Sequence, residues 1–320
     1  GKTLIAELSI LRMLNNRAER DGGSRHLEPK AVYIAPLKAL ARERVKDWRK
    51  RFGEGLGLCV LELTGDVTPD MAALRRADII ITTPEKWDGV TRSWQKREYV
   101  RAVRVVIIDE IHLLGEDRGP VLEVIVSRMR YISAQTDQEC RLVGLSTALA
   151  NAHDLADWLG IDPRPGRGMY NFRPSVRPVS MEVHIRGFPG KHYCPRMATM
   201  NKPTYSAIME HSPVNPALVF VASRRQTRLT ALDLISYCAA ADNPKQFLHM
   251  PEEEVETLAL TLRDQALKHT LLYGVAIHHA GLNDHDRSTV EELFVSGRIQ
   301  VLVCTATLAW GVNFPVRLVV

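Results

Sequence analysis

The sequence has no closely spaced cysteines, no long apolar run and no block of charge of one sign. Its five cysteines are Cys59, Cys140, Cys194, Cys238 and Cys304, and no two of them form a Cys-x-x-Cys pair. This spacing argues against a zinc site and favours reduced thiols in an intracellular, reducing compartment. No apolar run reaches membrane-spanning length, so we expect no membrane partner.

The composition is that of an ordinary globular protein. Of 320 residues, 45% are hydrophobic and 25% are charged, which excludes a disordered chain or a long coiled coil. The length exceeds one average core and suits two domains. The net charge of +5, from 42 basic against 37 acidic residues, permits a polyanion as partner without requiring one.

The run Val103–His112 reads Val-Arg-Val-Val-Ile-Ile-Asp-Glu-Ile-His and predicts a buried strand that ends in two carboxylates. A continuous β-branched run is typical of a parallel sheet covered on both faces. Because side chains alternate along a strand, Asp109 and Glu110 are expected to point different ways. One of them can then hold a metal ion while the other acts on a water. Taken alone, a strand that simply stops at charged residues is the commoner explanation.

The first three residues, Gly1-Lys2-Thr3, are typical of the end of a phosphate-binding loop that enters a helix. In such a loop the lysine reaches phosphates and the hydroxyl binds Mg²⁺. An isolated Gly-Lys-Thr occurs often by chance, but here it precedes a strand that ends in Asp-Glu. The two motifs together therefore favour a nucleotide site. Because only the end of the phosphate-binding loop is present, we expect the chain to belong to a longer protein.

Strands and helices alternate along the chain. Further strands are predicted at 31–35, 59–63, 78–82 and 141–145, and then at 179–183, 217–222, 274–278, 299–304 and 316–320. Residues 160–178 are rich in Pro and Gly and have no apolar periodicity, so we place the domain boundary there.

Several helix starts that follow these strands carry residues suited to anions. Lys38 lies at a strand-to-helix turn and is the basic residue that we expect near a ligand. Thr83-Pro84 begins a helix whose free N–H groups could bind a phosphate, although an ordinary capped helix is equally expected. Ser223 is followed by two arginines, the first being Arg224. The helix dipole disfavours cations in this first turn, so their placement is a hint of anion binding.

In this order the segments resemble the motifs of a superfamily-two helicase of the DExH type, in the group that contains the Ski-complex helicase and the large spliceosomal helicase. The matching segments are Gly1–Thr3, Ala35–Leu40, Thr64–Asp66, Thr83–Lys86, Asp109–His112, Ser146–Ala148, Phe220–Thr227, His279–Gly281 and Thr305–Pro315. Nine motifs in family order make the resemblance specific. The runs Leu113–Leu122 and Tyr193–Met197 look most similar to the second cassette of a two-cassette member.

The resemblance implies an α/β fold of two tandem RecA-like (P-loop NTPase) domains with parallel sheets, truncated at both ends. The first domain would span 1–170, the linker 171–178 and the second domain 179–320. The first would lack the start of the P-loop and the second the arginine motif that supports catalysis in such enzymes. We therefore expect residues 1–320 alone to hydrolyse little or no ATP.

The resemblance also implies roles for residues of a site for ATP and Mg²⁺. Lys2 would hold phosphates, Thr3 and Asp109 would hold Mg²⁺, and Glu110 would polarise the attacking water. Lys2, Asp109 and Glu110 are the expected catalytic residues. The remaining ATP-binding residues would be Gly1, Gly311 and Asn313.

Two further groups of residues follow from the resemblance. His112, Ser146 and Thr147 would couple the nucleotide site to domain movement, although Ser-Thr-Ala at 146–148 departs from the usual Ser-Ala-Thr. The residues expected to contact the backbone of single-stranded or partly duplex DNA or RNA are Pro36, Lys38, Thr83, Pro84, Ser223, Arg224 and Thr305. Contact with the backbone alone implies little sequence preference and strong salt dependence.

The function implied is an ATP-dependent helicase or translocase cassette that moves three-prime to five-prime. The two-cassette member implies a subunit of a multiprotein complex in nucleus and cytoplasm, acting in DNA alkylation repair or stalled-ribosome clearance. The alternative is a cassette that binds nucleotide but serves as a regulatory or interaction platform. A P-loop ATPase that acts on no nucleic acid ranks last. The intact Asp109-Glu110 pair favours the first hypothesis.

Overall fold

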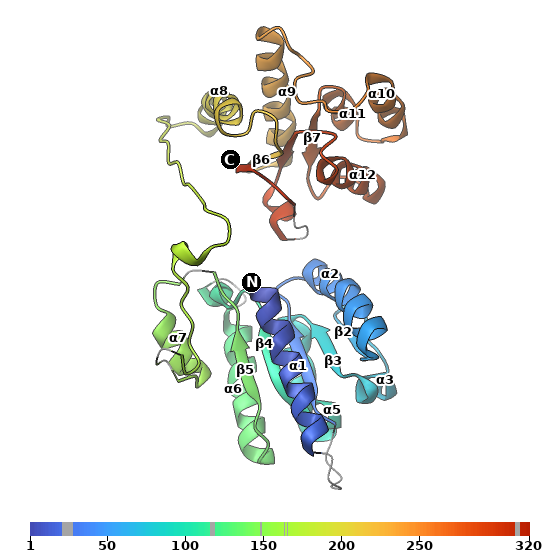
Figure 1. Cartoon of the computed structure of the whole chain (residues 1–320), viewed down its shortest axis with the longest axis vertical. Coiled ribbons are helices and arrows are strands. Elements are labelled where there is room, and N and C mark those ends of the chain that lie inside the picture. The colour runs from blue at the N-terminus through green and yellow to red at the C-terminus, as the bar shows by residue number, and fades with distance from the viewer. Residues whose placement is uncertain (21–27, 116–118, 148, 163, 165, 311–313) are drawn as a thin grey trace. The chain divides into compact units, whose positions relative to one another are not determined.

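The computed structural model describes residues 1–20, 28–115, 119–147, 149–162, 164, 166–310 and 314–320. They form two compact units, Gly1–Ser180 and Met181–Val320, and each unit is built around its own parallel sheet (Figure 1). No helix in the part of the chain that is described is long and apolar enough to span a membrane.

The first unit contains a five-stranded parallel sheet of order β2-β3-β1-β4-β5. Its strands are β1 (Lys30–Ile34), β2 (Val60–Leu63), β3 (Ile79–Thr82), β4 (Val103–Ile108) and β5 (Arg141–Gly144). All five coincide with predicted strands. The central strands β1, β3 and β4 are almost wholly buried, as their continuous Val and Ile runs require.

Helices cover both faces of this sheet. One apolar cluster joins α1 (Lys2–Arg20) and α2 (Lys38–Trp48) to one face, and Trp48 is fully buried there. The other cluster joins the opposite face to α4 (Pro84–Thr91), α5 (Glu98–Arg101) and α6 (Gly119–Thr136). The shorter elements are η1 (Arg49–Glu54), α3 (Met71–Arg76), η2 (Trp94–Lys96), η3 (Ile111–Gly115), α7 (Ala152–Leu159) and η4 (Pro174–Val176).

The five strands end at one level. Ile34 of β1 lies opposite Thr82 of β3 and Ile108 of β4, Thr82 lies opposite Leu63 of β2, and Ile108 lies opposite Gly144 of β5. Parallel strands in this register deliver the residues that follow them to a single edge of the sheet.

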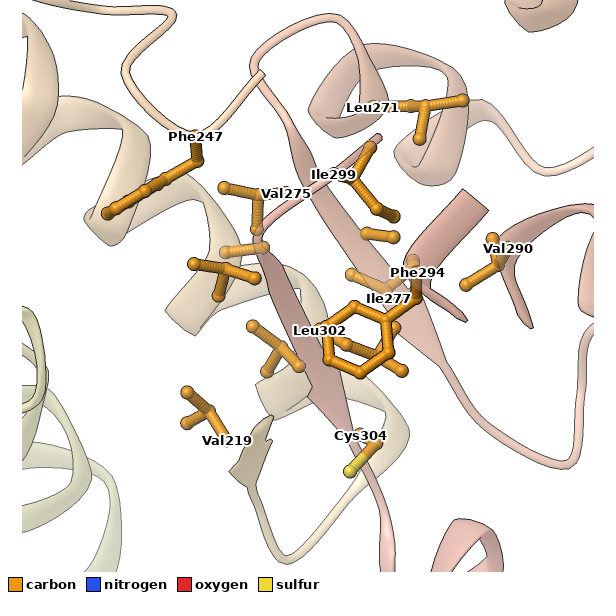
Figure 2. Packing of buried hydrophobic residues seen from close by; sticks show 14 of the residues in the cluster. Val219, Phe247, Leu271, Val275, Ile277, Val290, Phe294, Ile299, Leu302 and Cys304 are labelled. Carbon is orange, nitrogen blue, oxygen red and sulfur yellow. The ribbon is translucent and has the colours of Figure 1, made fainter. Parts of the chain in front are cut away.

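The second unit contains a four-stranded parallel sheet of order β7-β8-β6-β9. Its strands are β6 (Ala217–Phe220), β7 (Val275–His278), β8 (Val301–Cys304) and β9 (Leu318–Val319), and its helices are α8 (Tyr193–His211), α9 (Arg224–Ala240), α10 (Glu252–Thr261), α11 (Gln265–Leu271) and α12 (Asp284–Val295), with η5 (Ala306–Trp310). Figure 2 shows Ile277 and Leu302 of the sheet packed near Phe294 of α12, in the centre of one apolar core.

The predicted strand at 179–183 is wrong. These residues form no strand, and the side chains of Val179 and Val183 are 75% and 69% exposed. Apolar and polar residues do alternate here, but a strand also needs a neighbour that accepts its backbone hydrogen bonds.

The prediction that the Thr83 hydroxyl caps the following helix is also wrong, because the Thr83 side chain makes no cap hydrogen bond to α4.

A buried carboxylate joins two helices of the second unit. The Asp286 side chain is fully buried in the first turn of α12 and accepts hydrogen bonds from the backbone N–H groups of Arg263 (3.1 Å) and Asp264 (2.9 Å), immediately before α11. Burial raises the pKa of Asp286, but these backbone hydrogen bonds, together with side-chain hydrogen bonds with Asn283 and His285, hold it below its ordinary value. Ionised Asp286 therefore fastens α12 to the start of α11.

Two buried thiols give a first testable prediction. Burial raises the pKa of Cys304 to about 12 and that of Cys238 to about 11, and both thiols are free. Because only the thiolate reacts, we expect both to be alkylated at pH 8 at least about 100-fold more slowly than in the unfolded chain. Residue-resolved mass spectrometry after brief iodoacetamide labelling, with and without urea, measures this. Equal rates in the two conditions would contradict the burial of these strands and helices.

Candidate nucleotide and nucleic-acid site

The turn after β4 carries the two adjacent carboxylates. The Asp109 N–H donates to the Ile34 carbonyl (3.0 Å), and the Glu110 N–H donates to Asp109 Oδ1 (3.0 Å). Glu110 has a φ of +51°, in the left-handed region that residues other than Gly rarely adopt. Such strain tends to persist where the surrounding structure fixes a functional side chain. Both acids lie in this turn and not in the strand, and their carboxylates contact different partners, Tyr33 for Asp109 and Lys2 and His112 for Glu110.

Lys2 and Glu110 form a direct ion pair, although 108 residues separate them in the chain. Lys2 is the first residue of α1, and its side chain remains 36% exposed. The structure thus brings together two residues that the sequence assigned to one site, the lysine expected to hold phosphates and the carboxylate expected to polarise water.

His112 connects this ion pair to the end of β5. Three groups approach its Nδ1 atom: Glu110 Oε2 at 3.4 Å, Ser146 Oγ at 3.5 Å and the Thr147 N–H at 3.4 Å. A protonated Nδ1 can donate to Glu110 or Ser146, whereas an unprotonated Nδ1 can accept from Thr147. The three residues predicted to couple the site to movement therefore meet at one nitrogen, next to the predicted catalytic carboxylate.

Tyr33 is a member of the site that the sequence did not reveal. Its hydroxyl donates to Asp109 Oδ2, and its ring packs edge-on against Trp48 at 5.1 Å between centroids. Burial, followed by the nearby charge of Asp109, raises the pKa of Tyr33 well above its ordinary value. The phenol therefore stays a donor and orients the metal-binding candidate Asp109. A hydroxyl inside an otherwise apolar strand was the only available signal.

The opposite flank of the edge is basic. Lys38 Nζ and Arg42 NH2 both contact the carboxylate of Asp66, each at 2.6 Å. Arg42, one turn after Lys38 on α2, was not predicted as a member of the site. A small cavity beside the carboxylates is lined in part by Pro36, Pro84, Asp109 and Glu110.

Three of the predicted nucleic-acid contacts have buried side chains. Pro36, Thr83 and Pro84 are covered in the structure, and Thr83 is only 4% exposed. Their contribution to a ligand at this edge is limited to backbone atoms and the shape of the surface. Lys38, by contrast, is an exposed cation.

The second unit offers a comparable edge. The Ser223 hydroxyl caps α9 by accepting from the Gln226 N–H (3.2 Å), as predicted, and Arg224 follows it on the surface. Arg224 lies against Gly281, where an added Cβ would meet its guanidinium at 2.7 Å. Thr305 follows β8 at the same level, and its hydroxyl contacts that of Thr307 (2.9 Å). Gly311 and Asn313 lie outside the described residues.

The first unit presents several groups whose chemistry suits MgATP. Lys2 supplies a cation at the start of a helix, where backbone N–H groups and the helix dipole also favour phosphate. Thr3, Asp109 and Glu110 supply oxygen atoms. No group of three or more His, Cys, Asp or Glu residues in the described chain could hold a metal alone. Mg²⁺ does not need one, because it commonly combines one or two carboxylates with phosphate oxygens and water.

Comparison with protein families settles the class. The DEAD/DEAH box helicase family matches residues 1–155, and the helicase conserved C-terminal domain matches residues 202–320. The chain belongs to the superfamily-two DExH-box helicases. Its two parallel-sheet units are accordingly two tandem RecA-like domains of a helicase cassette.

Relatives of this helicase cassette are much longer proteins. It is 62% identical over all 320 residues to activating signal cointegrator 1 complex subunit 3 of human and zebrafish, and 60% identical to the DExH-box ATP-dependent RNA helicase DExH14 of Arabidopsis thaliana. The chain spans only 14%, 20% and 14% of these relatives, respectively.

Solved helicase structures share the fold. The helicase MrfA bound to DNA and AMPPNP aligns over 98% of this chain and 39% of its own, with a TM-score of 0.63 and 18% identity. The Mycobacterium smegmatis helicase Lhr bound to single-stranded DNA and AMP-PNP aligns over 99% and 37%, with a TM-score of 0.54 and 21% identity. At these identities the likeness concerns the fold alone.

Proposed function

We propose that the chain is an ATP-driven motor cassette that moves along single-stranded or partly duplex nucleic acid, three-prime to five-prime. The observation that carries the proposal is the unbroken series of contacts from Lys2 through Glu110 and His112 to Ser146 and Thr147. A phosphate-binding cation, a carboxylate that can orient water and a path leading away from them are the parts that a nucleotide-driven motor needs.

The residues divide the chemistry among them. MgATP supplies the transferable phosphoryl group and the metal charge when it is bound. Lys2 binds phosphate oxygens, Thr3 and Asp109 hold Mg²⁺, and Tyr33 keeps Asp109 oriented. Glu110 orients and polarises the attacking water. When Glu110 changes its contacts to do so, its contact with His112 changes as well.

The nucleic-acid surface of the proposal consists of exposed or half-buried side chains at the carboxyl edge of each sheet. Lys38 from the first unit, together with Ser223, Arg224 and Thr305 from the second, contacts sugar–phosphate groups. Backbone contacts of this kind carry little sequence preference. They also make binding salt-dependent, because each neutralised phosphate releases counterions.

For the parent protein we propose a two-cassette helicase, of which this chain is the second cassette. The names of its relatives support a role as subunit of a multiprotein complex. We propose that this complex acts in the nucleus and cytoplasm, in DNA alkylation repair, stalled-ribosome clearance or both. We further propose that residues 1–320 by themselves hydrolyse little ATP.

The experiment is strand displacement and ATP hydrolysis by the full-length protein on a duplex with either a three-prime or a five-prime overhang. We expect single-stranded nucleic acid to stimulate hydrolysis and displacement to require the three-prime overhang. DNA and RNA versions of the duplex identify the polymer. Displacement from the five-prime overhang alone would contradict the direction, and hydrolysis that ignores nucleic acid would contradict the motor proposal.

A further inference from the structure

We infer that Asp66 is an internal competitor of the phosphate backbone, holding Lys38 and Arg42 until a bound strand takes its place. This inference rests on the proposed function, because it concerns how the same surface admits nucleic acid. It assigns a role to an acidic residue in a region where a polyanion is expected to bind.

The geometry joins one carboxylate to two cations. Asp66 Oδ1 accepts from Lys38 Nζ and Asp66 Oδ2 accepts from Arg42 NH2, both at 2.6 Å. Lys38 and Arg42 are four residues apart in α2 and therefore lie on one face of the helix. Each carboxylate oxygen of Asp66 thus binds one cation, and two oxygens of a phosphate group could bind the same two cations.

The turn that carries Asp66 is fixed independently of these cations. The Thr64 N–H donates to the Val67 carbonyl (2.8 Å), and the Thr64 hydroxyl donates to Glu62 Oε1 (2.7 Å). Lys38 lies close to this turn, since a Cβ added at Gly65 would be 3.4 Å from Lys38 Nζ, an ordinary van der Waals distance. Asp66 is therefore held in place by its own turn, and the two flexible cations come to it.

All three side chains remain accessible to a competing anion. Lys38, Arg42 and Asp66 are 51%, 56% and 44% exposed, respectively. Ion pairs with this much exposure are weak individually, so a phosphate of similar geometry can displace the carboxylate. The hydrogen bond from Lys38 holds the pKa of Asp66 below its ordinary value, so the competitor is charged at neutral pH.

The charges at the start of α2 also favour an anion beside Lys38. Lys38 is the first residue of α2, and the first turn of this helix contains no acid. A cation there is disfavoured by the helix dipole unless a negative group lies beside it. Glu62 lies 3.9 Å from Arg42, but it is buried and accepts the hydrogen bond from the Thr64 hydroxyl. Asp66 is the exposed anion that a strand can replace.

The test is the salt dependence of single-strand binding by the full-length protein, measured by fluorescence anisotropy with a labelled oligonucleotide. Asp66→Asn keeps the shape of the side chain and removes its charge. The matched control is Asp47→Asn on the same helix, because Asp47 is 40% exposed and pairs with Arg44 and Arg51 at the other end of α2.

For Asp66→Asn we expect binding at low salt to become roughly two- to tenfold tighter. The slope of log affinity against log salt should steepen by about 0.7 for each of the two side chains, Lys38 and Arg42, that becomes free to neutralise a phosphate. In a Lys38→Ala, Arg42→Ala background the same substitution should change neither quantity. Asp47→Asn should leave both unchanged.

Weaker binding by Asp66→Asn, or an unchanged slope, would overturn the inference and make Asp66 a positioning residue or a bystander. The same gain in the background that lacks both cations would also overturn it. Failure of the unmodified protein to bind any single strand would instead overturn the proposed function. A thermal melt of each variant separates these outcomes from misfolding.

Discussion

Replacing Glu110 with Gln in the full-length protein, with its other cassette silenced, is expected to abolish nucleic-acid-stimulated ATP hydrolysis. Gln keeps the size of the side chain but loses the negative charge that contacts both Lys2 and His112. It can neither accept a proton nor polarise water as a carboxylate does. Loss of such a group commonly slows a reaction by roughly 10²–10⁴-fold.

Phosphate release over time measures this effect, and binding of a fluorescent ATP analogue shows whether the variant keeps its nucleotide site. Glu123→Gln is the matched control, since Glu123 is an exposed residue of α6 in the same unit. We expect the control to retain full turnover. Undiminished turnover by Glu110→Gln would favour the alternative in which this cassette is a regulatory platform.

Replacing Asp286 with Ala is expected to destabilise the second unit by roughly 2–5 kcal/mol. The substitution removes a fully buried carboxylate, so the N–H groups of Arg263 and Asp264 lose the acceptor of their partly buried hydrogen bonds. Each hydrogen bond to a charged group such as this carboxylate contributes about 1.5–3 kcal/mol. Urea unfolding of residues 1–320 measures the loss.

The control is Asp284→Ala, two residues earlier in the same helix, because the Asp284 side chain is fully exposed. Its removal affects only the helix dipole and an exposed pair, and we expect a loss below about 1 kcal/mol. Equal losses for the two variants would show that Asp286 does not join α11 to α12.

The same carboxylate predicts a pH dependence. Its pKa is lowered in the folded protein. Its contribution is therefore complete above the unfolded pKa of about 3.9 and is lost as pH falls through the lower folded value. The stability difference between the unmodified chain and Asp286→Ala should be constant near neutral pH and shrink below about pH 4.

Much of this architecture could be predicted from local sequence. Buried parallel strands have continuous Val and Ile runs, and the residues that follow them carry the motifs, so β4 and the Asp109-Glu110 turn were recognisable. The sequence also placed Lys2 and Glu110 in one nucleotide site, but the direct ion pair between them was not predicted, because no local pattern contains a contact across 108 residues. Residues 179–183 show the limit of periodicity, because alternation predicts which side chains share a face but not whether a neighbouring strand is present.

The members of the site that were missed depend on contacts between distant segments. Tyr33 belongs to the site because β1 lies beside β4, and Arg42 because the turn after β2 approaches α2. Neither neighbour can be read from the sequence around these residues. The buried side chains of Pro36 and Thr83 are a similar case, since a motif records residue type and not exposure.

The common level at which the strands end has a consequence for kinetics. Across the edge, the turns after β2, β3 and β1 lie on one side of Glu110, and the turn after β5, with Ser146, lies on the other. Substitutions at Asp66 or Lys38 should therefore change the nucleic-acid concentration needed for half-maximal stimulation and leave the maximal rate intact. Substitutions at Ser146 should lower movement per ATP consumed while hydrolysis continues. Affinity for nucleic acid, turnover of ATP and movement per ATP should thus vary separately, because the residues that govern them follow different strands of one sheet.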